Sequence, residues 1–270
     1  MSRNNFETIT QAMLYALMFL TRLPVGRWLT TADEQTAARA VYCYPLVGAV
    51  IGVLLALAAF GLQPLGPSLS AALVLVLWVA VTGALHLDGL ADCMDAYYAG
   101  HKCGDAEQRR EKILQVMHDP ACGAIALVSL VLLLLVKWAA LSALFTLFAH
   151  QSLVSVTSVL AAVIVTPVLA RTIILPFMML NGYARREGTV PAASDKNARR
   201  YWSVAVLVFA LCALSIGFFV TAVLLLALVL LMLFWARLWQ RQIGGYTGDC
   251  LGALVELSEA LVLITLVALW

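Results

Sequence analysis

Three aspartates stand close together at the end of a long apolar run, in the stretch HLDGLADCMDA at residues 86–96. Asp88, Asp92 and Asp95 are four and three residues apart, so on a helix they share a sector of roughly 60°. Carboxylates beside the membrane interior are costly unless a cation accompanies them. A solvated helix end would explain one aspartate, whereas three on one face favour a metal or proton site.

A second acidic group opens the last apolar segment, in GGYTGDCLGALVELSEA. Asp249 and Glu256 are two helical turns apart and lie on nearly the same face. Gly245, Thr247 and Gly248 form a glycine-rich turn before this helix. Such a turn presents free backbone N–H groups to a phosphate. The sequence therefore predicts that the two acids bind metal and that the turn binds substrate.

Other residues are candidates for substrate contacts. Asp119 precedes a proline where the third apolar segment begins, and both an N-cap role and a site role are open for it. Arg171 lies inside the fourth segment, where a buried guanidinium requires a carboxylate or a phosphate as its partner. Arg185 and Arg186 follow that segment and suit either phosphate binding or anchoring at the membrane surface.

Acidic clusters, a glycine-rich turn and arginines at one membrane face suit metal-assisted phosphoryl transfer. Carboxylates hold one or two Mg²⁺ ions, and the metal and the arginines neutralise a diphosphate and its leaving phosphate. Asp88, Asp92, Asp95 and Asp249 are therefore the candidates for catalysis as well as for metal binding.

The composition is that of a protein that crosses a membrane several times. Of the 270 residues, 63% are hydrophobic and 12% are charged, whereas soluble domains have about 25% charged residues. We expect an all-α polytopic bundle of about seven transmembrane helices, six to eight in range, that forms one catalytic domain over residues 1–270. An interfacial helix at 9–20 precedes it, and no cleavage site follows that helix. The expected spans are 43–62, 69–90, 122–147, 153–180, 202–218, 219–236 and 250–269.

The basic residues predict the orientation of these spans. Lysines and arginines lie before the first span and after the second, fourth and sixth, whereas the connections near 63–68 and 148–152 have none. The positive-inside rule then places each basic loop, and the acidic clusters beside them, in the cytoplasm. The stretch 202–236 is too long for one span, and LSIG at 214–217 is the expected turn within it. The six cysteines form no CxxC pair, so no zinc or redox motif is indicated.

Several stretches in order resemble the cobalamin synthase family, the adenosylcobinamide-GDP ribazoletransferases. They are FLTRLPVG, YPLVGAVIG, HLDGLADCMDA, ARREGT and GGYTGDCLGALVELSEALVL, and they extend over nearly the whole chain. The resemblance implies a magnesium-dependent enzyme of the bacterial inner membrane. This enzyme would join adenosylcobinamide-GDP to α-ribazole or its 5′-phosphate and release GMP on the cytoplasmic face.

The resemblance also implies roles for particular residues. Asp88, Asp92 and Asp95 would bind the metal, Asp249 and Glu256 would complete the metal or substrate site, and Arg185 would contact phosphate. The partners that it implies are the two substrates, the lipid bilayer, a second copy of the chain and other enzymes of the same late pathway. It implies no nucleic acid.

Two alternatives remain open. A CDP-alcohol phosphotransferase performs similar chemistry, but its motif requires Asp where this chain has Leu85 and Arg where it has Asp92. A cation- or proton-coupled transporter also has carboxylates inside the membrane. Such a transporter places its charges near the bilayer midplane in broken helices, whereas here most of them gather at one face.

Overall fold

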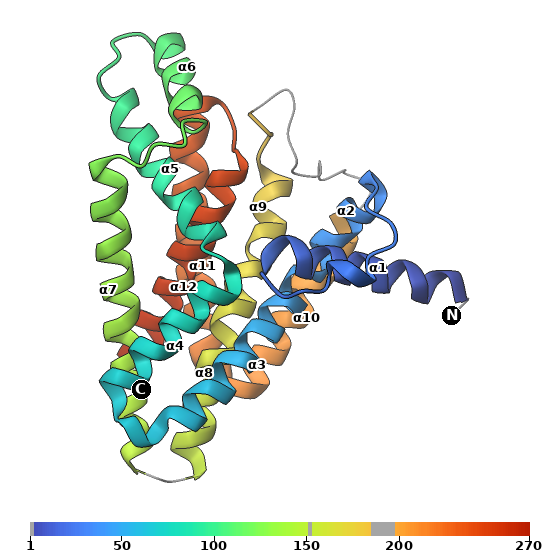
Figure 1. Cartoon of the computed structure of the whole chain (residues 1–270), viewed down its shortest axis with the longest axis vertical. Coiled ribbons are helices and arrows are strands. Elements are labelled where there is room, and N and C mark those ends of the chain that lie inside the picture. Colours follow the sequence, from blue (N-terminus) through green and yellow to red (C-terminus); the bar gives the residue numbers. More distant parts are fainter. Residues whose placement is uncertain (1–2, 151–152, 185–197) are drawn as a thin grey trace.

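The computed structural model describes residues 3–150, 153–184 and 198–270, which form an all-helical bundle as expected (Figure 1). Short 3₁₀ turns and loops connect the helices. In chain order they are α1 (Arg3–Leu20), α2 (Glu34–Ala40), α3 (Tyr44–Leu62), α4 (Pro67–Thr82), α5 (Leu85–Gly100), α6 (Ala106–Val116), α7 (Ala124–Thr146), α8 (Leu153–Thr172), α9 (Ile174–Leu180), α10 (Ala198–Ile216), α11 (Phe218–Ile243) and α12 (Gly248–Leu269).

Among the described residues, five segments are long and apolar enough to cross a membrane. The bent pair α4–α5 makes a sixth if its two halves count as one span, and the apolar part of α10 is shorter. The count of seven is therefore not confirmed, although six lies within the expected range of six to eight. The turn expected at 214–217 is confirmed, because α10 ends at Ile216 and Gly217 separates it from α11. The five segments are Glu34–Leu65, Ala124–Thr146, Val156–Leu180, Phe218–Ile243 and Gly248–Leu269.

The expected span at 69–90 is wrong as a single helix. The chain bends by 87° between α4 and α5, where Gly83 and Ala84 both adopt left-handed backbone conformations with φ of 61° and 59°. Two such residues in succession stop a right-handed helix, and the conformation costs an alanine about 1–2 kcal/mol. As a consequence, Asp88 lies in the first turn of a separate helix.

Different helices lie at the two ends of the bundle. Figure 1 shows α5 and α6 at one end, and the C-terminus near the opposite end, where α3 leads into α4. Helix α6 and its basic residues therefore lie at the same end of the bundle as α5. Helix α1 lies crosswise to the bundle (Figure 1) and is not among the candidate spans, as expected for an interfacial helix.

Helix α12 lies in the interior of the bundle. It contacts α5, α7, α8 and α11, and 72% of its apolar window is buried. The corresponding fraction is 28% in both α7 and α11, so most side chains of these two windows lie toward the outside of the bundle. A central position allows α12 to bring its acidic residues close to several other helices.

Helices α3 and α8 pack backbone against backbone through two glycines. A Cβ atom on Gly52 would lie 2.7 Å from the Cα atom of Ile164, and one on Gly48 would overlap the carbonyl group of Pro167. Small residues allow membrane helices to approach this closely.

Replacing Gly52 by alanine is expected to lower the thermal unfolding midpoint in detergent. The added methyl group has no space, and overpacking of this kind costs about 1–3 kcal/mol. Gly61 of the same helix is the matched control, because its Cβ would meet nothing within 4 Å. Gly61→Ala should leave the midpoint unchanged or raise it, since alanine favours helices. Equal midpoints for both variants would contradict the close packing.

Candidate active site

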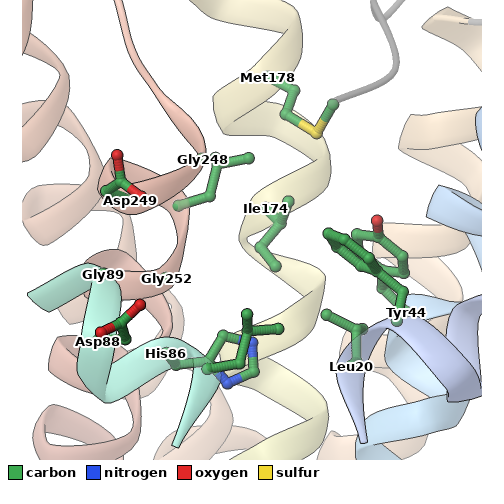
Figure 2. A pocket seen from close by; sticks show the side chains of 13 residues that line it. Leu20, Tyr44, His86, Asp88, Gly89, Ile174, Met178, Gly248, Asp249 and Gly252 are labelled. Atoms are coloured by element: carbon green, nitrogen blue, oxygen red, sulfur yellow. The ribbon is translucent and has the colours of Figure 1, made fainter. Parts of the chain in front are cut away.

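A cavity of about 210 Å³ opens between α5 and α12 on one side and α1, α3 and α9 on the other (Figure 2). Asp88 of α5 and Asp249 of α12 both line it. Asp88 is exposed and Asp249 is half-buried. The structure thus brings together two carboxylates that are far apart in the sequence, one from each of the predicted acidic clusters. The lining residues are Phe19, Leu20, Tyr44, Leu85, His86, Asp88, Gly89, Ile174, Met178, Gly248, Asp249, Leu251 and Gly252.

Glycines allow α5 and α12 to approach closely enough for this arrangement. A Cβ atom on Gly89 would lie 2.8 Å from the carbonyl oxygen of Asp249, and one on Gly252 would lie 3.3 Å from the Cα atom of His86. A larger residue at Gly89 would push the two helices apart and separate their carboxylates.

Asp92 and Asp95 follow Asp88 on α5, but they differ in what surrounds them. Asp92 and Asp249 both act electrostatically on the thiol of Cys93, whose Sγ atom lies 4.0 Å from that of Cys250. Cys93 therefore faces α12, and Asp92 directly precedes it on α5.

Asp95 is held by the start of α7. Its carboxylate accepts hydrogen bonds from the backbone N–H groups of Gly123 at 2.5 Å and Ala126 at 2.9 Å. A Cβ atom on Gly123 would lie 2.6 Å from a carboxylate oxygen of Asp95, so the glycine makes room for this contact. Asp95 thus supplies the N-terminal cap of α7 from another helix.

The N-cap role considered for Asp119 is wrong, because α7 begins five residues later, at Ala124. The exposed Asp119 side chain accepts a hydrogen bond from the N–H group of Ala121 at 3.0 Å, as in an Asx turn. It is not among the residues that line the cavity.

The glycine-rich turn mainly binds, through its backbone, the segment that follows α9. Tyr246 donates its N–H to the carbonyl of Gly182 at 3.0 Å and accepts from Ala184 at 2.9 Å. Gly245 is buried, and a Cβ atom there would overlap the Gly182 carbonyl. Burial and the neighbouring Tyr183 raise the pKa of Tyr246 to about 12, so this phenol stays protonated at neutral pH.

The end of the same turn leads into the cavity. Buried Thr247 caps α12 by accepting from the N–H group of Cys250 at 3.3 Å, and its hydroxyl lies 3.2 Å from a carboxylate oxygen of Asp249. Thr247 therefore helps to orient Asp249. Gly248, the first residue of α12, lines the cavity.

Glu256 and Arg171 lie in a separate cluster of buried charges. Lys137 Nζ lies 2.9 Å from Glu256 Oε2 and 2.6 Å from Glu259 Oε2, and Arg171 Nη1 lies 2.6 Å from Glu259 Oε1. We call these four residues the Lys137 cluster. All four are at least 96% buried, and none lines the cavity. The partner that Arg171 required is a carboxylate.

Arg185 and Arg186 lie outside the residues that the structure describes. The segment just before them is held by Arg110 of α6, which was not expected to have a structural role. Its guanidinium donates to the carbonyl of Ile243 at 3.1 Å and to that of Ala184 at 3.1 Å. This arginine thus links α6, the end of α11 and the chain beyond α9.

The sequence interpretation also missed Lys137 and His86. A single lysine inside a long apolar segment is costly without a counter-charge, and this signal predicts a buried acidic partner for Lys137. His86 was not among the expected site residues, because on a helix it lies on the far side from Asp88. Both residues nevertheless line the cavity.

The carboxylates at the cavity have the donor chemistry that magnesium prefers. In the described part of the chain, no group of three or more His, Cys, Asp or Glu side chains could hold a metal ion by itself. Magnesium, however, keeps several waters and is usually bound by one or two carboxylates together with substrate phosphates. Asp88 and Asp249 fit that mode of binding.

Comparison with known proteins agrees with the resemblance seen in the motifs. The family model described as cobalamin-5-phosphate synthase matches residues 12–267. The chain is 45% identical over 260 residues to a protein of Pseudomonas aeruginosa and 42% identical over 259 residues to one of Pseudomonas paraeruginosa. Both are named adenosylcobinamide-GDP ribazoletransferase, and each alignment covers 95% of this chain and 97% of the relative.

No solved structure matches the chain. The family match spans more than nine-tenths of the residues, including both carboxylates at the cavity. The chain therefore belongs to the cobalamin-5-phosphate synthase family.

Proposed function

We propose that this protein joins adenosylcobinamide-GDP to α-ribazole or α-ribazole 5′-phosphate and releases GMP. One observation carries the proposal: Asp88 and Asp249, from two distant motifs, line one cavity in a chain that is 42–45% identical to proteins named for this reaction. The protein works in the bacterial inner membrane, and the cavity opens toward the cytoplasm, where the basic loops lie.

The reaction is a displacement at phosphorus. A ribose hydroxyl of the acceptor attacks the phosphorus atom nearest the cobinamide, a new P–O bond forms, and the P–O bond to GMP breaks. A carboxylate at the cavity accepts the proton of the hydroxyl, and GMP departs with the bridging oxygen. The hydroxyl of Thr247 orients Asp249, whereas Asp88 is exposed.

We propose that magnesium binds between Asp88 and Asp249, with Asp92 as a further ligand. Bound there, the ion would neutralise the charge of the diphosphate. Asp95 and Glu256 have other partners in this structure, the backbone of α7 and Lys137, and we assign them to positioning rather than to metal binding. A transport function has no comparable support, because the buried charges are paired with one another.

Release of GMP tests the proposed function directly. Purified protein in detergent is incubated with adenosylcobinamide-GDP and α-ribazole, either with Mg²⁺ or with excess EDTA. We expect GMP only with Mg²⁺ and only with both substrates present, because the carboxylates are themselves anionic and the bound cation is what neutralises the diphosphate. Absence of GMP under all conditions would refute the transferase, and equal release in EDTA would refute the metal.

A further inference from the structure

One part of the cavity is mostly apolar and contains one unusual polar residue. Its walls come from α1, α3, α5 and α9, and Figure 2 shows the His86 ring on the α5 side and Leu20 and Tyr44 across from it. We call this part the inner chamber. Its lining residues are Phe19, Leu20, Tyr44, His86, Ile174 and Met178.

His86 lines this chamber without a hydrogen-bond partner among the described residues. The residue is only 3% exposed, and neither ring nitrogen meets a donor or acceptor in that part of the chain. A buried polar group without a partner costs about 1–3 kcal/mol, and such a group in a native structure calls for an explanation. A neutral imidazole has one N–H donor and one acceptor, so a ligand with a matching atom would remove the cost.

We propose that the inner chamber binds the base of the acceptor nucleoside, with a ring N–H of His86 donating to the free ring nitrogen of that base. This inference rests on the proposed function. The base of α-ribazole is a dimethylbenzimidazole, which is flat, mostly apolar and has a single free acceptor nitrogen. The chamber offers apolar walls for the ring and methyl groups and one buried donor for the nitrogen.

The other parts of the two substrates fit the chamber less well. Pockets that enclose a whole drug-sized ligand have about 300–1,000 Å³, so a cavity of about 210 Å³ accommodates a ring system but not a corrin. Guanine presents two acceptors and an amino donor along its edges and would need several polar partners. His86 and Tyr44 are the polar side chains that line the chamber.

The position of the chamber also suits the acceptor. Asp88 is two residues from His86 on α5, and both line the same cavity. A base held by His86 therefore places its attached ribose beside Asp88 and Asp249. The hydroxyl that attacks phosphorus would then lie next to the carboxylates that take its proton.

Binding of α-ribazole alone tests the inference without the reaction. We compare the wild-type protein with His86→Phe in detergent by titration calorimetry, with no donor substrate and no metal. Losing one hydrogen bond should weaken binding about 5- to 10-fold. His118→Phe is the matched control, because His118 is exposed and does not line the cavity, and it should bind as the wild type does.

A modified ligand that lacks the acceptor nitrogen tests whether His86 contacts that nitrogen directly. In an analogue of α-ribazole whose free ring nitrogen is replaced by CH, the hydrogen bond is already absent. The analogue should bind wild type and His86→Phe equally weakly, which is the signature of a direct contact in a double-mutant cycle. His86→Gln, which retains an N–H donor, should recover part of the affinity for α-ribazole. In turnover, KM should rise for the acceptor and not for the donor.

The outcomes separate this inference from the proposed function. If GMP is released normally but His86→Phe binds α-ribazole as tightly as wild type does, the inference is overturned and the transferase stands. If α-ribazole binds in a His86-dependent way but no GMP forms, the inference about the chamber is supported and the proposed reaction is refuted. If the wild type binds only phospholipid or detergent in the cavity, the chamber holds an acyl chain and the inference is overturned.

Discussion

Asp88→Asn and Asp249→Asn are each expected to lower the rate of GMP release by at least about 100-fold, the loss typical when one group that stabilises transition-state charge is removed. Asparagine keeps the size of the side chain but removes the negative charge that holds magnesium. The half-saturating Mg²⁺ concentration should rise in both variants, whereas thermal unfolding without metal should change little. The rate is measured with purified protein at saturating substrates.

Asp105→Asn serves as the matched control for this pair. Asp105 caps α6 by accepting from the N–H groups of Glu107 and Gln108 at 3.2 Å, and asparagine caps helices equally well. Its residual activity should equal that of the wild type. Substantial GMP release by Asp88→Asn or Asp249→Asn would show that the cavity between α5 and α12 is not the catalytic centre.

Glu259→Gln is expected to lower the thermal unfolding midpoint strongly. Glu259 pairs with both Lys137 and Arg171 at 2.6 Å, and removing one member of a buried ion pair costs about 3–5 kcal/mol because the partner charge remains. After the substitution, Arg171 loses its carboxylate partner, because the remaining carboxylate of the cluster, Glu256, pairs with Lys137. Differential scanning fluorimetry of the protein in detergent measures the loss.

A charge-balanced double variant tests whether pairing is the cause. Lys137→Met combined with Glu256→Gln removes one positive and one negative charge and leaves the Arg171–Glu259 pair intact. It should be more stable than the sum of the two single losses predicts. Glu111→Gln, an exposed residue on α6, is the control and should unfold as the wild type does. Strict additivity would contradict the proposed coupling.

Hydropathy and charge predicted the parts of the fold that depend on local sequence. The helical class, the turn before Phe218 and the crosswise first helix follow from runs of apolar residues and their interruptions, which each segment carries by itself. The bend at Gly83 and Ala84 could not be predicted in this way, since alanine favours helices and nothing local requires a left-handed conformation there.

The sequence predicted the candidate site where the residue types alone show that side chains belong to one site. Asp88 and Asp249 line one cavity, because glycines on both helices permit close approach of their backbones. Asp95 and Glu256 share helices with them, but each found a partner on α7, and helical spacing says nothing about a third helix. For Glu256, the sequence did contain a signal for its partner, because Lys137 is a single charge inside a long apolar segment.

The Lys137 cluster has a consequence for the order in which the protein is made. Lys137 and Arg171 belong to α7 and α8, whereas both of their counter-charges are on α12, the last helix of the chain. Each charge at the centre of a membrane helix disfavours insertion by about 2.5–3.5 kcal/mol. The earlier helices therefore enter the bilayer with uncompensated charges, and the nascent chain becomes electrically neutral inside only when translation of α12 is complete.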